Sequence, residues 1–294
     1  MMKLNTEICN AFDKHAKDYE QAAKVQTEIG ERLFERLSYL KIVPRYVLDL
    51  GCGTGIFTRL LKKKYPKATI IAFDLSQAML RESKRKQGFL RRWPLVNGDM
   101  TQLPFVDGAF DLVFANQVIH WSNPLQPLLA ELNRVMKRNG CLMFSTLGPD
   151  TFKELNQAWQ GADGYMHSNQ FVDMHDIGDD LLAERFLDPV VDMEFLTVHY
   201  SSLNLLVHGL KSQGVRNINQ ARNKGLTGKK AWQLFAAKYK NFCTSNGKYP
   251  LTYEVIYGHA WKGEQQRKGN RTETFISIEN IKRSPKDSHD EKNK

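Results

Sequence analysis

The feature that most constrains this chain is a glycine-rich turn that directly follows a short apolar run. The run is Val47–Leu50, the turn contains Gly51, Gly53 and Gly55, and helical spacing of apolar residues begins at Ile56. Glycine reaches positive φ without strain, and its missing Cβ lets a ligand approach the main chain. The first turn of a helix also leaves backbone N–H groups unpaired. The pattern therefore predicts a strand, a ligand-binding loop and a helix in succession.

The spacing of the glycines distinguishes between ligands. A dinucleotide site has the pattern G-x-G-x-x-G, whereas this loop reads G-x-G-x-G after an acid two positions earlier. The segment resembles the D-x-G-x-G-x-G loop of class I S-adenosylmethionine-dependent methyltransferases. The resemblance implies that Asp49, Gly51, Cys52, Gly53 and Gly55 bind this cofactor. A glycine turn in another kind of α/β protein is the alternative.

Segments with the strand period and the helix period alternate along the first half of the chain. The expected strands are 46–50, 69–74, 94–96, 110–115 and 141–147, and the expected helices between them include 77–86 and 125–137. This alternation is typical of an α/β, doubly wound and mostly parallel sheet. The methyltransferase resemblance implies a seven-stranded Rossmann-like sheet, and further strands are expected at 190–200 and 252–261.

The remaining segments give the domain prediction. Phe12, Ala16 and Tyr19 share one face of a single N-terminal helix by their spacing, and Asp150 is expected to cap a helix at 151–159. The excursion at 201–249 is too long for a plain connection between strands. The predicted parts are an N-terminal helical segment over the site (1–43), a cofactor-binding core (44–200), an inserted basic helical lid (201–249), the last core strand (250–263) and a charged, largely disordered tail (264–294).

Composition indicates a soluble protein without a metal. Hydrophobic residues make up 41% of the 294 residues, and no apolar run has the length of a membrane span. The four cysteines are scattered without metal-ligand spacing, so we expect free thiols in a reducing compartment. The first ten residues lack the apolar core of a signal peptide. The expected location is the cytoplasm.

The positive charge of the chain is unevenly placed. The net charge is +10, and the stretch between Glu194 and Glu254 contains no acid but nine Lys or Arg residues. A segment of one sign favours an anionic partner through long-range attraction. A solvated pair of basic helices is the alternative. Nucleic acid is a less favoured partner, because the sequence shows no zinc finger and no aromatic RNA-binding motif.

The ends of the next two strands supply further candidates for the cofactor. Asp74 ends the second strand, 19 residues after Gly55, where an acid can accept hydrogen bonds from ribose hydroxyls. Together with Ser76 it could instead cap the following helix. The adjacent Leu75 and Met79 are candidates to enclose the adenine ring, although each suits the core equally well.

Polar residues also follow the third and fourth strands. The methyltransferase resemblance implies that Asp99, followed by Met100, binds the adenine amino group, with a turn residue as the alternative. Asn116 ends the fourth strand, and His120 and Trp121 come shortly after it. Because the carboxyl ends of parallel strands face the ligand crevice, these residues are candidates for the floor between cofactor and substrate.

Motifs elsewhere in the chain narrow the resemblance. They are F-x3-A-x2-Y at 12–19, IHW at 119–121, FSTLG at 144–148, FVDMHDIG at 171–178, LKSQGVRN at 210–217, GLTG at 225–228 and YPLTYE at 249–254. Together they resemble the malonyl-acyl-carrier-protein O-methyltransferase family of biotin synthesis, from about Phe12 to Trp261. The resemblance implies methyl transfer from S-adenosylmethionine to the free carboxylate of a malonyl thioester, with S-adenosylhomocysteine as the second product and acyl carrier protein as the partner.

A carboxylate acceptor needs no general base, because a carboxyl with a reference pKa near ~4 is ionised at neutral pH. Positioning therefore dominates, and a guanidinium positions a carboxylate at two points. The candidates are Arg222 first and Arg216 second, with Tyr19 and His120 as orienting donors; Tyr19 is also a candidate for cofactor binding. Surface roles are the alternative for each of them.

Three other functions remain compatible with the sequence. A respiratory complex I assembly factor associated with arginine hydroxylation resembles the same group and requires no malonyl carrier. A methyltransferase acting on RNA or on another small molecule would use the basic segment for a different anion. A non-catalytic protein that retained the cofactor fold is disfavoured by the intact glycine loop together with Asp74 and Asp99.

Overall fold

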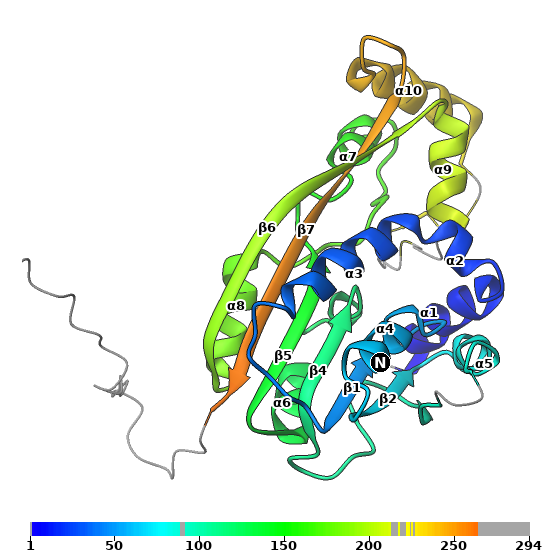
Figure 1. Cartoon of the computed structure of the whole chain (residues 1–294). Helices are drawn as coiled ribbons and strands as arrows, with labels where there is room; N and C mark the ends of the chain where they lie inside the picture. The colour runs from blue at the N-terminus through cyan, green and yellow to red at the C-terminus, as the bar shows by residue number, and fades with distance from the viewer. Residues whose placement is uncertain are drawn as a thin grey trace, which may run out of the picture. The chain divides into compact units, whose positions relative to one another are not determined.

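The computed structural model describes residues 2–88, 92–212, 217, 222, 223, 225 and 227–263. The predicted tail at 264–294 lies outside the described residues. The helices are α1 Met2–His15, α2 Tyr19–Ala22, α3 Lys24–Arg36, α4 Ile56–Lys64, α5 Gln77–Arg85, α6 Gln126–Val135, α7 Lys153–Trp159, α8 Met174–Ala183, α9 Leu203–Ser212 and α10 Lys229–Tyr239, with short 3-10 turns η1 Ile119–Trp121 and η2 Lys240–Phe242 (Figure 1). The strands are β1 Tyr46–Leu50, β2 Thr69–Asp74, β3 Leu95–Asn97, β4 Phe110–Asn116, β5 Met136–Leu147, β6 Phe186–Tyr200 and β7 Tyr249–Lys262.

These strands form one seven-stranded sheet in the order β3-β2-β1-β4-β5-β7-β6. The pairs from β3 to β5 are parallel, and β7 runs antiparallel to both β5 and β6. The order reverses at β1, with β2 on one side and β4 on the other. In such sheets the ligand crevice lies at the carboxyl ends of the strands beside this reversal. The α/β doubly wound, mostly parallel sheet expected from the sequence is confirmed.

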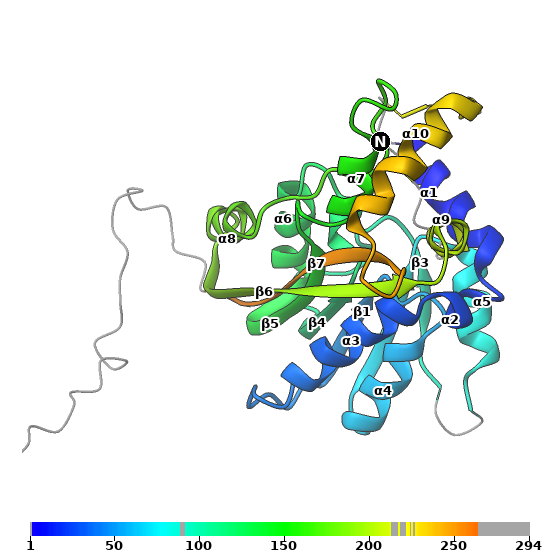
Figure 2. The same cartoon turned by 90° about the horizontal axis from the view of Figure 1, so that it is seen from above.

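Alternation along the strands explains the layers on the two faces of the sheet. In β4, Leu112 and Phe114 belong to one buried cluster, whereas Val113 and Ala115 belong to another. Successive side chains of a strand point to opposite faces. Figure 2 shows α3 and α4 on one side of the sheet and α6 and α8 on the other. The middle of β4, residues 112–115, is buried and entirely apolar, as is typical of a strand covered on both faces.

The N-terminal helix differs from the prediction. Phe12, Ala16 and Tyr19 do not share one helix, because α1 ends at His15 and a turn closed by Asp18 N–H to His15 C=O (3.1 Å) separates it from α2. The turn brings the ring of Tyr19 edge-on to Phe12, with 6.2 Å between ring centroids. Helical periodicity could not reveal this break.

Other element boundaries also differ from the sequence prediction: β6 begins at Phe186 rather than at 190, β7 begins at Tyr249 rather than at 252, and two further cases show the physical reason. Asp150 does not cap α7: its own N–H donates to the Glu254 carboxylate at 2.6 Å, and the helix begins after Phe152, which has a φ of +63°. Strand β5 begins at Met136 rather than at 141, and a register irregularity against β4 accommodates Asn139 at a φ of +60°. In both places contacts with a distant strand override the local turn signal.

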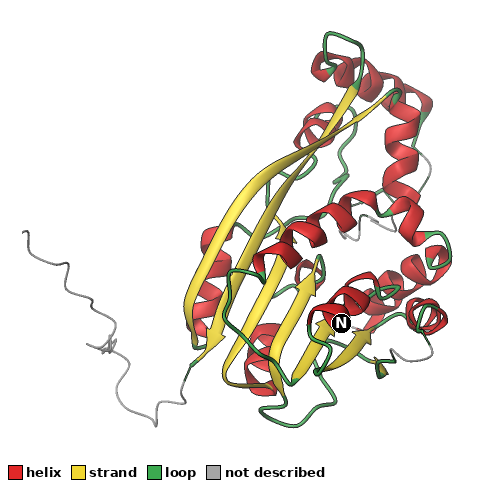
Figure 3. Cartoon of the chain, in the orientation of Figure 1, coloured by secondary structure: helices red, strands yellow, loops and turns green. Residues whose placement is uncertain are grey.

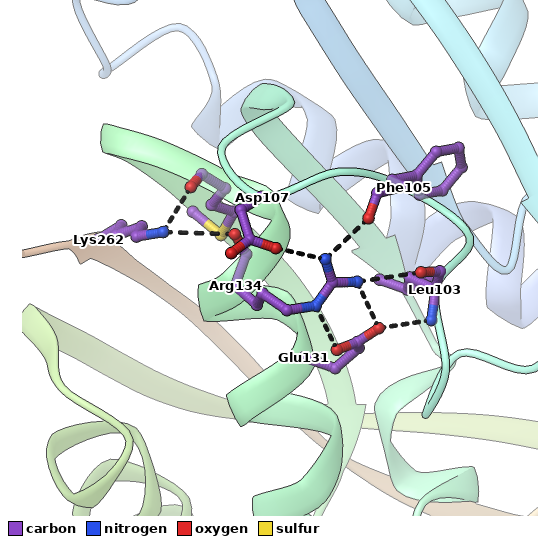
Figure 4. A network of polar contacts seen from close by, with 7 residues as sticks. Leu103, Phe105, Asp107, Glu131, Arg134 and Lys262 are labelled. Atoms are coloured by element: carbon purple, nitrogen blue, oxygen red, sulfur yellow. Dashed lines mark hydrogen bonds and ion pairs between the residues drawn. The ribbon is translucent and has the colours of Figure 1, made fainter.

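The loop before β4 is held to α6 by a network around Arg134 (Figure 4). Its guanidinium donates to the backbone carbonyls of Leu103 and Phe105 and forms ion pairs with Asp107 and Glu131, both at 2.7 Å. These carboxylates raise the pKa of Arg134. The network fixes the segment that follows residues 98–100, and it thereby supports the rim of the site. Figure 3 shows the loops that connect the strands and helices of the chain.

Along the chain, helices α9 and α10 follow β6 and precede β7, within the segment predicted as an insertion (Figure 1). Trp159 of α7 stacks on Phe235 of α10 at 4.1 Å between centroids, and the Tyr239 hydroxyl donates to Pro250 C=O at 2.7 Å. These contacts join α10 to α7 and to the start of β7. Among the described residues, no helix has the length and apolar character needed to cross a membrane.

Candidate functional site

The backbone conformation of the glycine loop, which follows β1, is fixed by hydrogen bonds to the neighbouring strand β2. Gly51, Gly53 and Gly55 all have positive φ, at +67°, +54° and +83°. The N–H groups of Gly51 and Cys52 donate to Phe73 C=O at 2.8 and 3.0 Å. A Cβ added at Gly51 would lie 2.5 Å from the side chain of Val118. The loop therefore requires glycine both for its conformation and for its close approach to the segment after β4.

The Asp74 carboxylate, at the end of β2, forms a hydrogen bond to the backbone of the glycine loop. Its two oxygens accept the N–H groups of Gly53 and Ser76, each at 2.8 Å. Burial raises the pKa of Asp74 to about 6, with these hydrogen bonds opposing the shift and the charge of Asp13 adding to it. The Ser76 hydroxyl also accepts from Met79 N–H at the start of α5 and donates to Asp13 of α1. Ser76 therefore caps α5, as the alternative prediction for Asp74 and Ser76 proposed. This capping is compatible with the predicted role of Asp74 toward a ligand.

A pocket at the carboxyl ends of β1 to β4 encloses about 780 Å³ of empty volume, including its open mouth. We call it the glycine-loop pocket. The structure brings nine of the predicted cofactor residues to its wall: Tyr19, Gly51, Gly53, Asp74, Leu75, Met79, Asp99, Met100 and Asn116. Residues of α1 form part of the same wall. This agreement is a matter of position, and the role of each residue stays a prediction.

Three other residues predicted to bind the cofactor do not line this pocket. Asp49 is buried behind the loop, where it accepts the Thr58 hydroxyl, and burial raises its pKa to about 7. Cys52 is also buried, which raises the pKa of its thiol. Asp49 and Cys52 border a smaller hollow behind the loop, which we call the inner pocket. Gly55 is the residue that precedes α4.

Two polar residues of the pocket wall are also bound within the protein. The Asp99 carboxylate accepts both the N–H and the hydroxyl of Thr101, at 2.9 and 2.8 Å, which is the turn that the sequence suggested. The Asn116 side chain donates to Gln26 C=O at 3.1 Å and accepts the Ser145 hydroxyl at 2.7 Å. Both side chains are therefore held in fixed orientations at the edge of the glycine-loop pocket.

A second hollow, the aromatic pocket, adjoins the first and has an empty volume of about 450 Å³. Phe12, Tyr19, Gln117 and Trp121 line both pockets. The other residues that line it are Gln26, His120, Leu147, Phe152, Asn169, Phe171 and Tyr253. No Lys, Arg, Asp or Glu occurs among these described lining residues. The two pockets therefore meet at an aromatic wall, with the carboxylates of Asp74 and Asp99 in the glycine-loop pocket and no charged side chain in the described lining of the aromatic pocket.

His120 and Tyr19 lie where the sequence placed them, at this junction. Burial lowers the pKa of His120 to about 3, so its ring is neutral at physiological pH, and its Nδ1 lies 3.4 Å from the Thr146 hydroxyl. The ring stands edge-on to Phe171, with 5.6 Å between centroids. Burial and the nearby charge of Asp74 raise the pKa of Tyr19, which keeps its hydroxyl protonated. Both side chains therefore present neutral polar groups.

Of the two candidate arginines, Arg222 is not among the described residues that line these pockets. Arg222 forms an ion pair with Glu7 of α1 at 2.7 Å, which joins the connection between α9 and α10 to the N-terminal helix. Arg216 lies outside the described residues. Their proposed contact with a substrate carboxylate stays a prediction.

Sequence reasoning missed several lining residues of these pockets. Gln26 and Gln117 carry no recognisable motif, and Phe171 and Tyr253 were noted only as parts of family-like segments. Cys9 of α1 lines the glycine-loop pocket, and its thiol lies 3.7 Å from Leu75 C=O. A signal was available for Gln117 alone, since it directly follows the strand-ending Asn116.

This fold and this arrangement of the glycine loop define a methyltransferase domain. A family model described as a methyltransferase domain matches residues 48–144. The solved structure of the YcgJ protein from Bacillus subtilis is similar with a TM-score of 0.56 and 16% identity, covering 79% of this chain and 98% of that one. At this identity the likeness concerns the fold alone.

The particular family follows from more similar sequences. A protein from Legionella pneumophila named malonyl-[acyl-carrier protein] O-methyltransferase is 61% identical over 95% of this chain and 99% of its own length. One from Coxiella burnetii, named malonyl-[acyl-carrier protein] O-methyltransferase 1, is 42% identical over 93% of this chain and 94% of its own. The chain belongs to the malonyl-[acyl-carrier protein] O-methyltransferase family.

Proposed function

We propose that the protein transfers a methyl group from S-adenosylmethionine to the free carboxylate of a malonyl group on acyl carrier protein. The products would be S-adenosylhomocysteine and the malonyl methyl ester that begins biotin synthesis. Family membership supports the reaction. The structural observation that carries the proposal is the meeting of the glycine-loop pocket and the aromatic pocket at Tyr19 and Trp121, because a direct transfer requires two adjoining sites.

The residues of the glycine-loop pocket fit an adenosyl ligand. The Asp74 carboxylate is held at the pocket wall and can accept hydrogen bonds from ribose hydroxyls. Leu75 and Met79 offer apolar surface to the base, and Asp99 offers an acceptor to its amino group. The glycine loop presents main chain without Cβ atoms. We assign these residues, with Tyr19 and Asn116, to binding of the cofactor.

The aromatic pocket suits the acceptor because its described lining offers neutral polar groups that can orient a carboxylate. Bound S-adenosylmethionine supplies a methyl group on a positively charged sulfur, and an ionised carboxylate accepts it without a general base. His120 stays neutral and donates or accepts a hydrogen bond according to its tautomer. Phe12, Phe171 and Trp121 give this pocket apolar ring surface, which would limit the access of water to the reacting groups. Correct alignment supplies roughly 7–11 kcal/mol in favourable cases.

Acyl carrier protein, which we take to be acidic, is the proposed partner because the segment between β6 and β7 carries only positive charge. Its described cations are Lys211, Arg222, Lys229, Lys230, Lys238, Lys240 and Lys248. We assign this segment, as a lid, to docking of the carrier, and we place the enzyme in the cytoplasm. Attraction between surfaces of opposite sign is screened by salt. Turnover with malonyl carrier is therefore expected to fall as salt is raised from low to physiological concentration, and turnover indifferent to salt would contradict the docking assignment.

A transfer assay tests the proposed reaction. The purified protein is incubated with methyl-labelled S-adenosylmethionine and with malonyl carrier, acetyl carrier or RNA in separate reactions. Label is expected on malonyl carrier alone, and mild ester hydrolysis should release it. Equal label on acetyl carrier would exclude the free carboxylate as the acceptor. Label on RNA alone, or none on malonyl carrier, would overturn the proposed function.

A further inference from the structure

Gln117 combines three features that no role described so far explains. Its side-chain nitrogen Nε2 is buried and has no hydrogen-bond partner among the described residues. It lines the glycine-loop pocket, the inner pocket and the aromatic pocket, so it lies where all three meet. Its backbone has a φ of +54°, which is uncommon for a residue other than glycine. A buried amide donor without a partner is costly to the folded protein unless a ligand uses it.

The backbone of Gln117 is held in this conformation by β5. Its N–H donates to the carbonyl and to the hydroxyl of Ser145, at 3.1 and 3.0 Å. The Ser145 hydroxyl in turn donates to the side chain of Asn116 at 2.7 Å. Strained conformations persist where the surroundings over-determine them, and they concentrate at functional sites. The side chain is therefore directed by a rigid frame.

The charge of the surroundings indicates what this amide binds. The described lining of the aromatic pocket contains no cation, and His120 is neutral. A carboxylate loses its charge when it becomes an ester, so a cation would stabilise the starting state more than the transition state. A neutral amide N–H orients the same carboxylate at a smaller cost to its reactivity. We propose that Gln117 Nε2 donates a hydrogen bond to the acceptor carboxylate and selects acceptors that carry one.

Both reactants of the proposed function, on which this inference rests, carry a carboxylate. The acceptor's carboxylate must reach the junction of the two pockets, because it forms the new bond to the methyl group there. The methionine carboxylate of the donor is separated from the reacting sulfur by three carbon atoms. Tyr19, the other polar residue common to both pockets, lies near the charge of Asp74 and so belongs to the donor's end. Gln117 is thus assigned to the acceptor.

The test compares Gln117→Leu with the wild type in steady-state kinetics and in binding. We expect the KM for malonyl carrier to rise about tenfold, as for loss of one hydrogen bond to a charged group. The Kd for S-adenosylhomocysteine, measured by calorimetry, should change less than twofold. Inhibition by acetyl carrier, which has no free carboxylate, should not change. Gln117→Asn keeps the amide and tolerates positive φ, so it should fall between the wild type and the leucine variant.

Gln157→Leu, at an exposed glutamine of α7, is the matched control and should behave as the wild type. A parallel loss of affinity for S-adenosylhomocysteine in Gln117→Leu would assign the amide to the donor's carboxylate and overturn the inference. An unchanged KM for malonyl carrier would also overturn it. Because the wild type is assayed first on malonyl carrier, a failure of the proposed function is seen there, separately from a failure of the variant.

Discussion

The glycine-loop pocket and the aromatic pocket share a wall, but the chain assembles them differently. The first is formed largely by short loops that follow β1, β2, β3 and β4 in turn, all within residues 51–121. The second draws on segments between Phe12 and Tyr253, including the loop at 169–171 and strand β7. A parallel sheet brings successive strand ends to one edge without help from the rest of the chain. The aromatic pocket depends on contacts between distant parts of the sequence.

The chemistry of the two pockets differs in the same way. The glycine-loop pocket contains carboxylates, and Asp74 is held by two backbone N–H groups. The aromatic pocket contains neutral polar groups between rings, and burial keeps His120 uncharged. Under the proposed function, a cofactor with several polar groups would be bound by fixed hydrogen bonds, whereas the reacting carboxylate would be oriented but kept reactive. The proposal therefore assigns binding strength to one pocket and selectivity to the other.

The substitution Asp74→Asn has the largest expected effect, and it tests whether the glycine-loop pocket binds its ligand through a carboxylate. Removing the charge should weaken binding of S-adenosylhomocysteine about 100-fold, because hydrogen bonds to a charged group contribute roughly 1.5–3 kcal/mol each. Calorimetry measures the Kd, and Asp176→Asn at an exposed site on α8 is the control. Unchanged affinity would mean that this acid serves only the loop and the start of α5.

The pH dependence of binding gives a second test. The pKa of Asp74 is raised to about 6, so its carboxylate is ionised above that pH and gains a proton below it. If the ionised form binds the ribose, affinity for S-adenosylhomocysteine should be nearly constant above about pH 7 and about tenfold below that plateau at pH 5. His120, with a pKa near 3, should add no inflection to the acceptor KM in this range. A flat profile in the wild type, or the same break in Asp74→Asn, would contradict the assignment.

Trp121→Ala probes the wall that both pockets share. The indole stands edge-on to Phe12 at 5.7 Å and contacts the ring of His120 at 5.1 Å between centroids. We expect the KM values for donor and acceptor to rise together by about fivefold, since an aromatic pair contributes roughly 1 kcal/mol beyond its buried area. Steady-state kinetics with each substrate varied in turn measures this. An effect on one KM alone would show that the wall belongs to a single pocket.

The sequence predicted the glycine-loop pocket well because its signals are local. Strand ends after apolar runs identified Asp74 and Asn116, and the glycine spacing identified the loop. What the spacing did not show is the depth of each residue behind the surface of the pocket. Asp49 belongs to the same motif, but it lies behind the loop and bonds Thr58 instead of lining the pocket. One-dimensional spacing does not distinguish the two sides of a loop.

The aromatic pocket was predicted poorly for a physical reason. Phe171 and Tyr253 reach it through loop 169–171 and β7, and their positions follow from tertiary contacts that have no sequence period. Glu154 illustrates this: its buried carboxylate accepts Thr252 N–H at 3.0 Å across 98 positions and fixes the path of β7 beside α7. Likewise, the turn after His15 that redirects Tyr19 left the helical pattern of apolar residues intact.

The position of α1 has a kinetic consequence. This helix contributes Ile8, Cys9 and Phe12 to the glycine-loop pocket, and it is fastened at Glu7 to Arg222 and at Asp13 to Ser76. If the product of the proposed reaction lies beneath this helix, its release requires the helix to move away and both of these contacts to break. Product escape, and with it the turnover number, would then be governed by how often a short amphipathic helix detaches, rather than by the speed of bond making at the junction.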